Sequence, residues 1–231
     1  MTSKPFSIID ALKFGFSALW ENILQVGLVF IGGIIALGVL NVVTWLIFLI
    51  FYTVKSDPNT MNIYPVLMFF LFVFFLIFLA SFAFNMVIGR IALDAYDKKK
   101  TELRPLLSVF GIYLLATTLF YWLTFFGLIL FIIPGVIWYF KYYFVDLIVI
   151  DTGMGFVDAF KRSNELTYGH KWYLLAEYLL MNLLILVSIV TIIGPVVLVL
   201  VNMFSRAYIY RKLVEAHNKD ISQFTAVPAN M

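Results

Sequence analysis

The sequence predicts an all-α protein, a polytopic membrane helix bundle of about six transmembrane helices. Three observations predict it: an apolar composition, long apolar runs, and a one-sided distribution of Lys and Arg. Hydrophobic residues make up 63% of the 231 positions and charged residues 13%. A soluble domain has roughly a quarter charged residues and about half apolar ones. The mean hydropathy of +1.00 leaves too much apolar surface for a soluble core of this length.

The first expected element is an amphipathic helix over residues 1–22, lying in the interface on the inner side of the membrane. Apolar residues recur at helical spacing while polar residues fall on the opposite side. The first ten residues lack the basic, apolar and small-residue order of a cleavable signal peptide. The apolar positions are Ile8, Ile9, Leu12, Phe16, Leu19 and Trp20, opposed by Asp10, Lys13, Ser17 and Glu21.

Six spans are expected within the transmembrane domain, residues 23–213, because a spanning helix needs about 20 mostly apolar residues. The first run exceeds that length, so it should tilt, bend near Gly32-Gly33 or emerge into water. The third and fourth spans are separated either at Gly127 or at the Ile133-Pro134-Gly135 turn. A polar tail follows over residues 214–231. The expected spans are residues 23–54, 65–95, 106–126, 128–150, 172–192 and 196–210.

A second amphipathic helix with a weaker apolar stripe is expected over about residues 154–168, before the fifth span. Its start, Asp158-Ala159-Phe160-Lys161, aligns with Asp10-Ala11-Leu12-Lys13. The ends of the second and sixth spans also match, since Asn85-Met86 and Arg90 correspond to Asn202-Met203 and Arg206. One explanation is a parallel internal repeat of interfacial helix, span, outer turn and span. Chance similarity between apolar segments is the other explanation.

The orientation follows from Lys and Arg in the short loops, which concentrate on the cytoplasmic side. With the N-terminus inside, six spans leave Lys55 as the outer basic residue. We therefore expect a multi-pass plasma-membrane protein with both termini cytoplasmic. The residues placed inside are Lys4, Lys13, Lys98, Lys99, Lys100, Arg104, Lys161, Arg162, Lys171, Arg211, Lys212 and Lys219.

One part of the chain carries a family resemblance. It contains Ile133-Pro134-Gly135-Val136-Ile137, then Asp158-Ala159-Phe160-Lys161-Arg162-Ser163, then Gly169-His170-Lys171-Trp172. This order resembles uncharacterised bacterial six-span proteins related to the membrane domain of glycerophosphoryl diester phosphodiesterases, including the YciC-like group. The resemblance covers about residues 133–172 and implies a six-helix membrane domain without an established activity. The soluble phosphodiesterase domain that accompanies some relatives is not present in this sequence.

Charged residues within the predicted spans form the candidate site. A charge at the centre of a spanning helix costs about 2.5–3.5 kcal/mol on insertion scales. One hypothesis is a polar cluster in which Arg90 and Arg206 oppose Asp146 and Glu177, receiving a lipid phosphate or coupling a proton. The alternative is that long side chains reach the headgroups and the acids pair structurally. The candidate residues are Arg90, Lys141, Asp146, Glu177 and Arg206.

Catalytic motifs are weak. Asp151-Thr152-Gly153 has the aspartic-protease letters, but that chemistry needs two carboxylates sharing one site. His170 and His217 are too few and too far apart for a metal site, and the chain contains no Cys. We therefore expect no catalytic residue, cofactor or metal, and no enzyme. The net charge of +3 gives no indication of a nucleic-acid partner.

The expected function is that of a non-enzymatic integral membrane protein of the cell envelope. It would handle or sense lipid, with anionic headgroups as ligands, or transport an amphiphilic substrate. The alternative is a structural or assembly factor whose partner is another membrane protein or a second copy of the chain. A transporter should contain a solvent-reachable cavity lined by Asn and charged residues. A scaffold should instead have a filled interior and an exposed groove.

Overall fold

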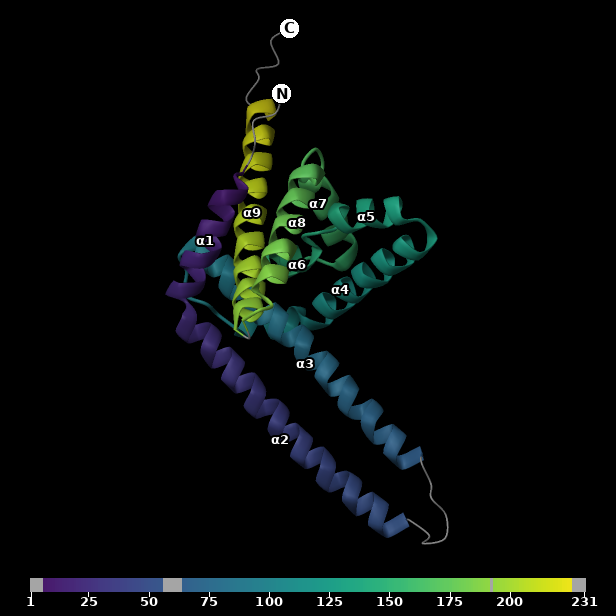
Figure 1. Ribbon diagram of the computed structural model, residues 1–231. Coiled ribbons are helices and arrows are strands. Elements are labelled where there is room, and N and C mark those ends of the chain that lie inside the picture. The colour runs from purple at the N-terminus through teal and green to yellow at the C-terminus, as the bar shows by residue number, and fades with distance from the viewer. Residues whose placement is uncertain (1–5, 56–63, 192, 226–231) are drawn as a thin grey trace.

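The computed structural model describes residues 6–55, 64–191 and 193–225, and these ranges fold as helices with no strand (Figure 1). The predicted all-α fold is confirmed. The elements are α1 Ile8–Glu21, α2 Ile23–Lys55, α3 Tyr64–Asp97, α4 Arg104–Leu130, α5 Ile132–Lys141, α6 Val145–Thr152, α7 Phe156–Thr167, α8 Lys171–Ser188 and α9 Gly194–Thr225.

Five segments of the described chain are long and apolar enough to cross a membrane, which is compatible with an integral membrane protein. The first half of α9, expected as the sixth span, is not among them, because polar and charged residues such as Asn202 and Arg206 dilute its hydropathy. The six-span count therefore stays a prediction. The five segments are Ile23–Leu49, Val66–Asp97, Arg104–Leu130, Ile132–Thr152 and Lys171–Ser188.

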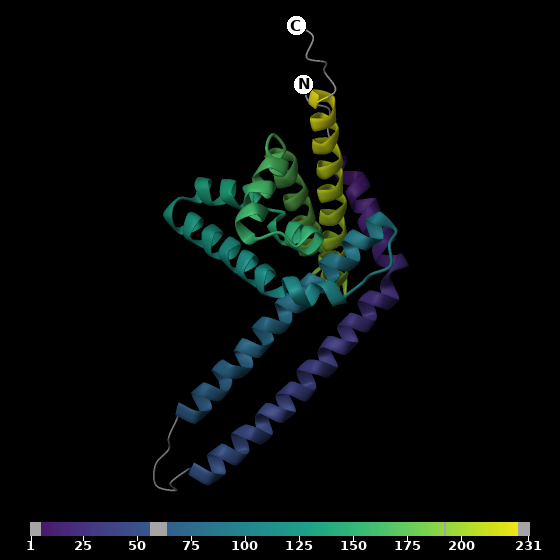
Figure 2. The same ribbon diagram turned by 180° about the vertical axis from the view of Figure 1, so that it is seen from behind.

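Helix α2 and the first half of α3 form a two-helix arm that extends away from the other helices (Figures 1 and 2). Helix α2 continues through Gly32-Gly33 without interruption. Edge-to-face rings join the two helices, with centroids 5.6 Å apart for Trp45 and Phe69 and 5.0 Å for Phe30 and Phe84. Most other apolar side chains of the arm are exposed, as expected for lipid-facing helices. Between the first two expected spans, residues 56–63 lie outside the described residues.

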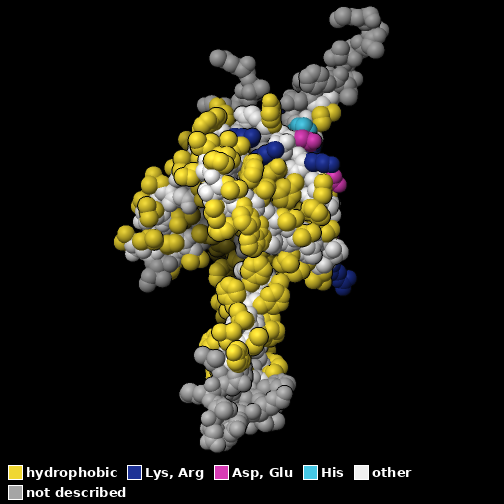
Figure 3. All heavy atoms as spheres, turned by 90° about the vertical axis from the view of Figure 1, so that its right-hand side faces the viewer, with side chains coloured by type: hydrophobic (Ala, Val, Ile, Leu, Met, Phe, Trp, Pro, Cys, Tyr) yellow, Lys and Arg dark blue, Asp and Glu magenta, His cyan; other side chains and the backbone are white. Residues whose placement is uncertain are grey.

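The core lies where the C-terminal half of α3 meets α4, α6 and α9, and α8 packs against α9 beside it. Helix α6 is at its centre, and five of its eight residues are buried. Figure 3 shows apolar side chains over most of one face, with charged side chains mostly toward the end where the C-terminal half of α9 emerges. The largest buried apolar side chains include Met86, Ile88, Phe144, Ile148, Met181 and Phe204.

Helix α1 packs along α9 in the opposite direction (Figure 1). Ser205 donates its hydroxyl to the Ala11 carbonyl at 3.0 Å. At Gly15 the contact is so close that a Cβ would meet the Val201 carbonyl oxygen at 2.7 Å and the Ser205 hydroxyl as well. The predicted apolar stripe is divided: Leu19 is buried, whereas Ile9, Phe16 and Trp20 stay exposed to the surroundings.

Helix α7 buries the same positions as α1 when the two are aligned as in the proposed repeat. Ala11, Gly15, Ala18 and Leu19 are buried in α1, and Ala159, Ser163, Leu166 and Thr167 in α7. The neighbours differ, because α1 packs on α9 whereas α7 packs on the junction of α5 and α6. The internal repeat therefore stays a prediction.

Helices α4 and α5 form a tight hairpin whose turn is at Phe131, between the two positions that the sequence offered. Phe131 is extended, with φ −155°. Pro134 lies in the first turn of α5, where its missing N–H has no intrahelical partner to lose. Gly127 and Gly135 face each other so closely that a Cβ on Gly135 would meet the Gly127 carbonyl carbon at 2.7 Å. Leu128, expected to begin the fourth span, therefore belongs to α4.

The expected fourth span is also broken at residues 142–144, which separate α5 from α6. A helix break in an apolar setting needs partners for its free backbone groups. The Lys141 carbonyl accepts hydrogen bonds from Ser163 at 3.2 Å and Thr167 at 3.1 Å, and the Phe144 N–H donates to the Ser163 hydroxyl at 3.3 Å. Helix α7 thus supplies the groups that stabilise the break.

Candidate functional site

The break between α5 and α6 positions an ion pair in the interior of the bundle. Arg206 of α9 donates to the Tyr143 carbonyl at 2.6 Å and to Asp146 Oδ1 at 3.0 Å. Its guanidinium also lies 4.5 Å from the centroid of the Tyr143 ring, within cation–π distance. Arg206 is therefore bound by two groups: the Tyr143 carbonyl, which the break leaves without a helical partner, and Asp146 in the first turn of α6.

Glu177 of α8 joins this group through Tyr143. Its side chain is 1% exposed, and the Tyr143 hydroxyl donates to Oε2 at 3.3 Å. The other carboxylate oxygen, Oε1, has no hydrogen-bond partner among the described residues. Tyr143 thus contacts Arg206 through its ring and carbonyl, and Glu177 through its hydroxyl. We call Tyr143, Asp146, Glu177 and Arg206 the Tyr143 cluster.

The structure brings Asp146, Glu177 and Arg206 together and places Arg90 and Lys141 elsewhere. Arg90 pairs with Asp94, one turn along α3, at 3.0 Å, and its NH1 lies 3.5 Å from the carbonyl oxygen at the α6 residue Ile150. The Lys141 ammonium lies 5.2 Å from the Tyr142 ring centroid. Two arginines from α3 and α9 therefore flank α6 near its opposite ends.

A second polar group, which the sequence analysis missed, joins α3, α6 and α9. Arg211 donates to Asp151 Oδ2 at 2.8 Å and to Asp97 Oδ2 at 2.7 Å. Tyr210 donates to Asp151 at 2.9 Å. Asp97 and Asp151 thus share the Arg211 guanidinium, since its Nη2 lies 2.7 Å from Asp97 Oδ2 and 2.8 Å from Asp151 Oδ1. The sequence gives no signal for this group, because its members lie 60 and 114 residues apart.

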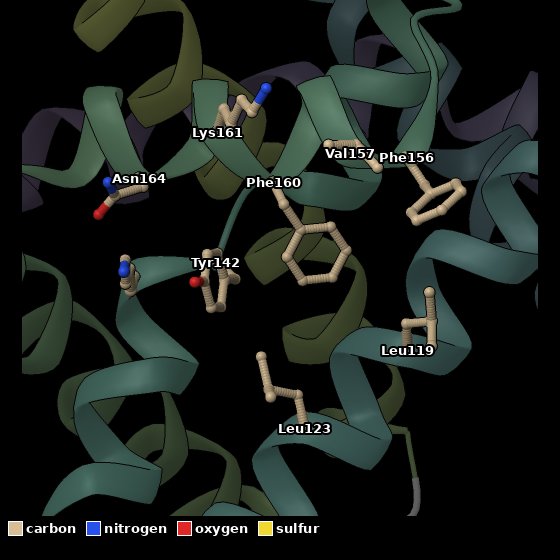
Figure 4. A pocket seen from close by; sticks show the side chains of 9 residues that line it. Leu119, Leu123, Tyr142, Phe156, Val157, Phe160, Lys161 and Asn164 are labelled. Carbon is tan, nitrogen blue, oxygen red and sulfur yellow. The ribbon is translucent and has the colours of Figure 1, made fainter.

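A groove lies between α4, α5 and α7, with a volume of about 470 Å³. Figure 4 shows the Phe160 ring pointing into it, with Leu119 and Leu123 on the α4 side and Tyr142 opposite. Basic and polar side chains, namely Lys141, Lys161 and Asn164, complete the lining. The Lys161 ammonium nitrogen lies 3.9 Å from Asp158 Oδ1, and both side chains are exposed. This ion pair therefore contributes little to the free energy of folding.

Lys141 therefore provides the less compensated charge of the groove. It has no ion-pair partner within the ranges that the structure covers. An apolar wall beside ammonium groups suits an amphiphile with an acidic headgroup.

In the described part of the chain, no three His, Asp or Glu side chains converge to hold a metal ion.

A third group lies beyond the apolar part of α9 and predicts a pH effect. Tyr96 donates to Glu215 Oε1 at 2.7 Å and Lys212 to Oε2 at 2.9 Å. The hydrogen bonds from Tyr96 and Lys212 lower the pKa of Glu215. A lowered pKa means that this contact stabilises the fold above the unfolded value of about 4.3 and is lost as the pH falls through the folded value.

Lowering the pH from above about 4.3 through the folded pKa of Glu215 is therefore expected to loosen the end of α9 from α3. Hydrogen exchange of residues 212–219, corrected for the pH dependence of the intrinsic rate, measures it. Glu215→Gln should show the loosened exchange already at neutral pH, while Glu102→Gln, whose carboxylate has no ion-pair partner among the described residues, should match the wild type. Equal exchange in wild type and Glu215→Gln at neutral pH would contradict the assignment.

Comparison of the chain with models of protein families, with curated proteins and with solved structures finds no match. The groove and the buried polar groups are therefore the features of the molecule that indicate a function.

Proposed function

We propose that the protein is a non-enzymatic integral membrane protein of the cell envelope that binds an anionic lipid or a similar amphiphile. The groove between α4, α5 and α7 carries this proposal, because it combines apolar walls with Lys141 and Lys161. The acyl chain would lie against Leu119, Leu123 and Phe160. The acidic headgroup would meet the two ammonium groups, with Asn164 as a further hydrogen-bond donor.

The chemistry of the groove favours an amphiphile over a small water-soluble substrate. Most of its lining is aliphatic or aromatic, so a fully polar ligand would lose hydration without gaining partners. A groove of about 470 Å³ accommodates part of a lipid chain and leaves the rest in the bilayer. An attraction of about 1 kcal/mol per Lys is typical for cations close to an anionic lipid surface.

We further propose the bacterial inner membrane as its location, with both termini in the cytoplasm. The concentration of Lys and Arg in the predicted inner loops supports this orientation. The packing of α1 against α9 also supports it, because this contact brings the N-terminal helix onto the helix that ends the described chain. The resemblance to six-span membrane proteins of the YciC-like group is consistent with the same topology.

Native mass spectrometry after purification in mild detergent, with identification of the retained lipids, tests the proposal. The wild type should retain an anionic phospholipid in preference to a zwitterionic one. Lys141→Gln and Lys161→Gln should each weaken retention about fivefold, as expected for about 1 kcal/mol per Lys. Lys13→Gln removes the same charge from α1 and should leave retention unchanged.

Unchanged lipid retention in the Lys141→Gln/Lys161→Gln double variant would refute the groove between α4, α5 and α7 as the binding site.

The alternative function, a structural or assembly factor, is favoured by the arm, where α2 and α3 enclose a second, apolar groove of about 450 Å³. Gly33, Leu37, Ala80 and Phe84 are among its lining residues, and small residues let helices approach closely. Co-purification of a stoichiometric membrane-protein partner without lipid would support that alternative.

A further inference from the structure

The Tyr143 cluster contains two acids and one base, and this imbalance has a consequence beyond lipid binding. Asp146 and Arg206 form a direct pair at 3.0 Å, which leaves Glu177 without a countercharge of its own. If both acids were ionised, the cluster would carry one net negative charge inside the bundle. Protonation of one carboxyl makes it neutral, and a low-dielectric interior favours the neutral state.

Glu177 is the acid that meets the conditions for holding the proton. Its side chain is 1% exposed, its single hydrogen bond comes from the Tyr143 hydroxyl, and Oε1 is unpartnered within the described chain. Asp146 is more exposed, at 24% of its side chain, and is already paired. The unsatisfied oxygen and the missing countercharge both disfavour an ionised Glu177.

The other titratable and charged groups around Glu177 do not remove this imbalance. Helix α5 and the turn after it contribute Tyr139 and Tyr143, whose rings are 5.6 Å apart. Helix α8 itself contributes Tyr178, 5.3 Å from Tyr139. Tyrosines are neutral at physiological pH and therefore supply no countercharge. The positive charge of the cluster is Arg206 of α9, which already forms an ion pair with Asp146 of α6.

We propose that Glu177 is a reversible proton-binding site in the interior of the bundle. In the pairing that the structure shows, Glu177 is the neutral carboxylic acid. Its ionisation breaks the carboxyl O–H bond and transfers the proton to water, leaving a carboxylate that needs a donor. The Arg206 Nε–H has no partner among the described residues, so it is the donor that this carboxylate recruits.

Proton release is thereby coupled to the break between α5 and α6. Arg206 holds both the Tyr143 carbonyl and Asp146, which lie on either side of the start of α6. A carboxylate at Glu177 competes with Asp146 for the same guanidinium. The protonation state of one buried side chain thus biases how firmly α9 holds the start of α6.

Labelling with the apolar reagent dicyclohexylcarbodiimide, which reacts with protonated carboxyls in apolar surroundings, tests the site on the wild-type protein. Peptide mass spectrometry should locate the adduct at Glu177 at neutral pH. At pH values above the titration midpoint of Glu177, the yield of the Glu177 adduct should fall about tenfold per pH unit, because the protonated fraction of the carboxyl falls by the same factor. Asp146, held by Arg206, and Glu165, exposed on α7, are internal controls that should remain unlabelled. Absence of the adduct at Glu177 throughout, or a yield independent of pH, would overturn the proposal.

A conservative variant separates proton binding from a purely structural role. Glu177→Gln has the shape of the neutral acid, so it should melt at the wild-type temperature at acidic pH. At alkaline pH the variant should melt higher than the wild type, because only the wild type must bury a carboxylate there. Glu165→Gln should follow the wild type at every pH. A Glu177→Gln protein that is destabilised equally at all pH values would show that the carboxyl is needed for packing alone.

Discussion

Arg206→Met is expected to lower the free energy of unfolding by about 3 kcal/mol, one of the two largest effects we predict. The substitution removes the countercharge of Asp146, which lies 3.0 Å from the guanidinium. It also removes the donor to the Tyr143 carbonyl at 2.6 Å and the cation over the Tyr143 ring. Removing one partner of a buried ion pair costs about 3–5 kcal/mol. Both side chains are more than one fifth exposed, which favours the lower end of that range.

Reversible unfolding in mixed detergent–SDS micelles measures this loss. The double variant Arg206→Met/Asp146→Leu should recover most of it, because replacing both members of a buried pair by apolar residues is often neutral. The control is Arg162→Met, which removes an exposed pair with Glu165 at 3.4 Å and should cost at most about 1 kcal/mol. Equal losses for Arg206→Met and Arg162→Met would show that the Tyr143 cluster does not stabilise the bundle.

The helical fold was predictable from the sequence, because its signals are local or compositional. The apolar excess predicts membrane helices, and the 3.6-residue periodicity of residues 8–20 corresponds to α1, although Leu19 is the one fully buried position of the predicted apolar stripe. The hairpin between α4 and α5 was predictable to within a few residues from Gly127 and Pro134. The arrangement of the arm beside the other helices was not, since its apolar side chains point in all directions and give no preferred face.

The candidate site was predictable only in part, because its geometry depends on contacts distant in sequence. The cost of charge in a membrane singled out Asp146, Glu177 and Arg206 without indicating which of them pair. The break at residues 142–144 is stabilised by side chains 19 to 63 residues away in the sequence, so the continuous apolar run gave no sign of it. Tyr143 joins Glu177 of α8 to Arg206 of α9. In the sequence it cannot be distinguished from the other aromatic residues expected near the membrane interface.

Gly135→Ala is expected to cost about 3 kcal/mol, because the added methyl group meets backbone that cannot rotate away. Its Cβ would lie 2.7 Å from the Gly127 carbonyl carbon and 2.8 Å from the Leu128 Cα. Relief requires α4 and α5 to separate, and overpacking of this kind typically costs 1–3 kcal/mol, occasionally more. Both helices line the groove that we assign to lipid, so retention of the anionic lipid should fall together with stability.

Gly111→Ala is the matched control, since no atom beyond its own helix lies within 4 Å of the position of its Cβ. This change should be neutral or should stabilise α4 by about 0.5–1 kcal/mol, the usual difference between Ala and Gly inside a helix. Unfolding in mixed micelles gives the two free energies, and native mass spectrometry gives the retained lipid. If Gly135→Ala and Gly111→Ala behave alike in both measurements, the two helices do not approach as closely as the structure shows. If Gly135→Ala loses stability but keeps its lipid, the hairpin is confirmed and the lipid must bind elsewhere than between α4, α5 and α7.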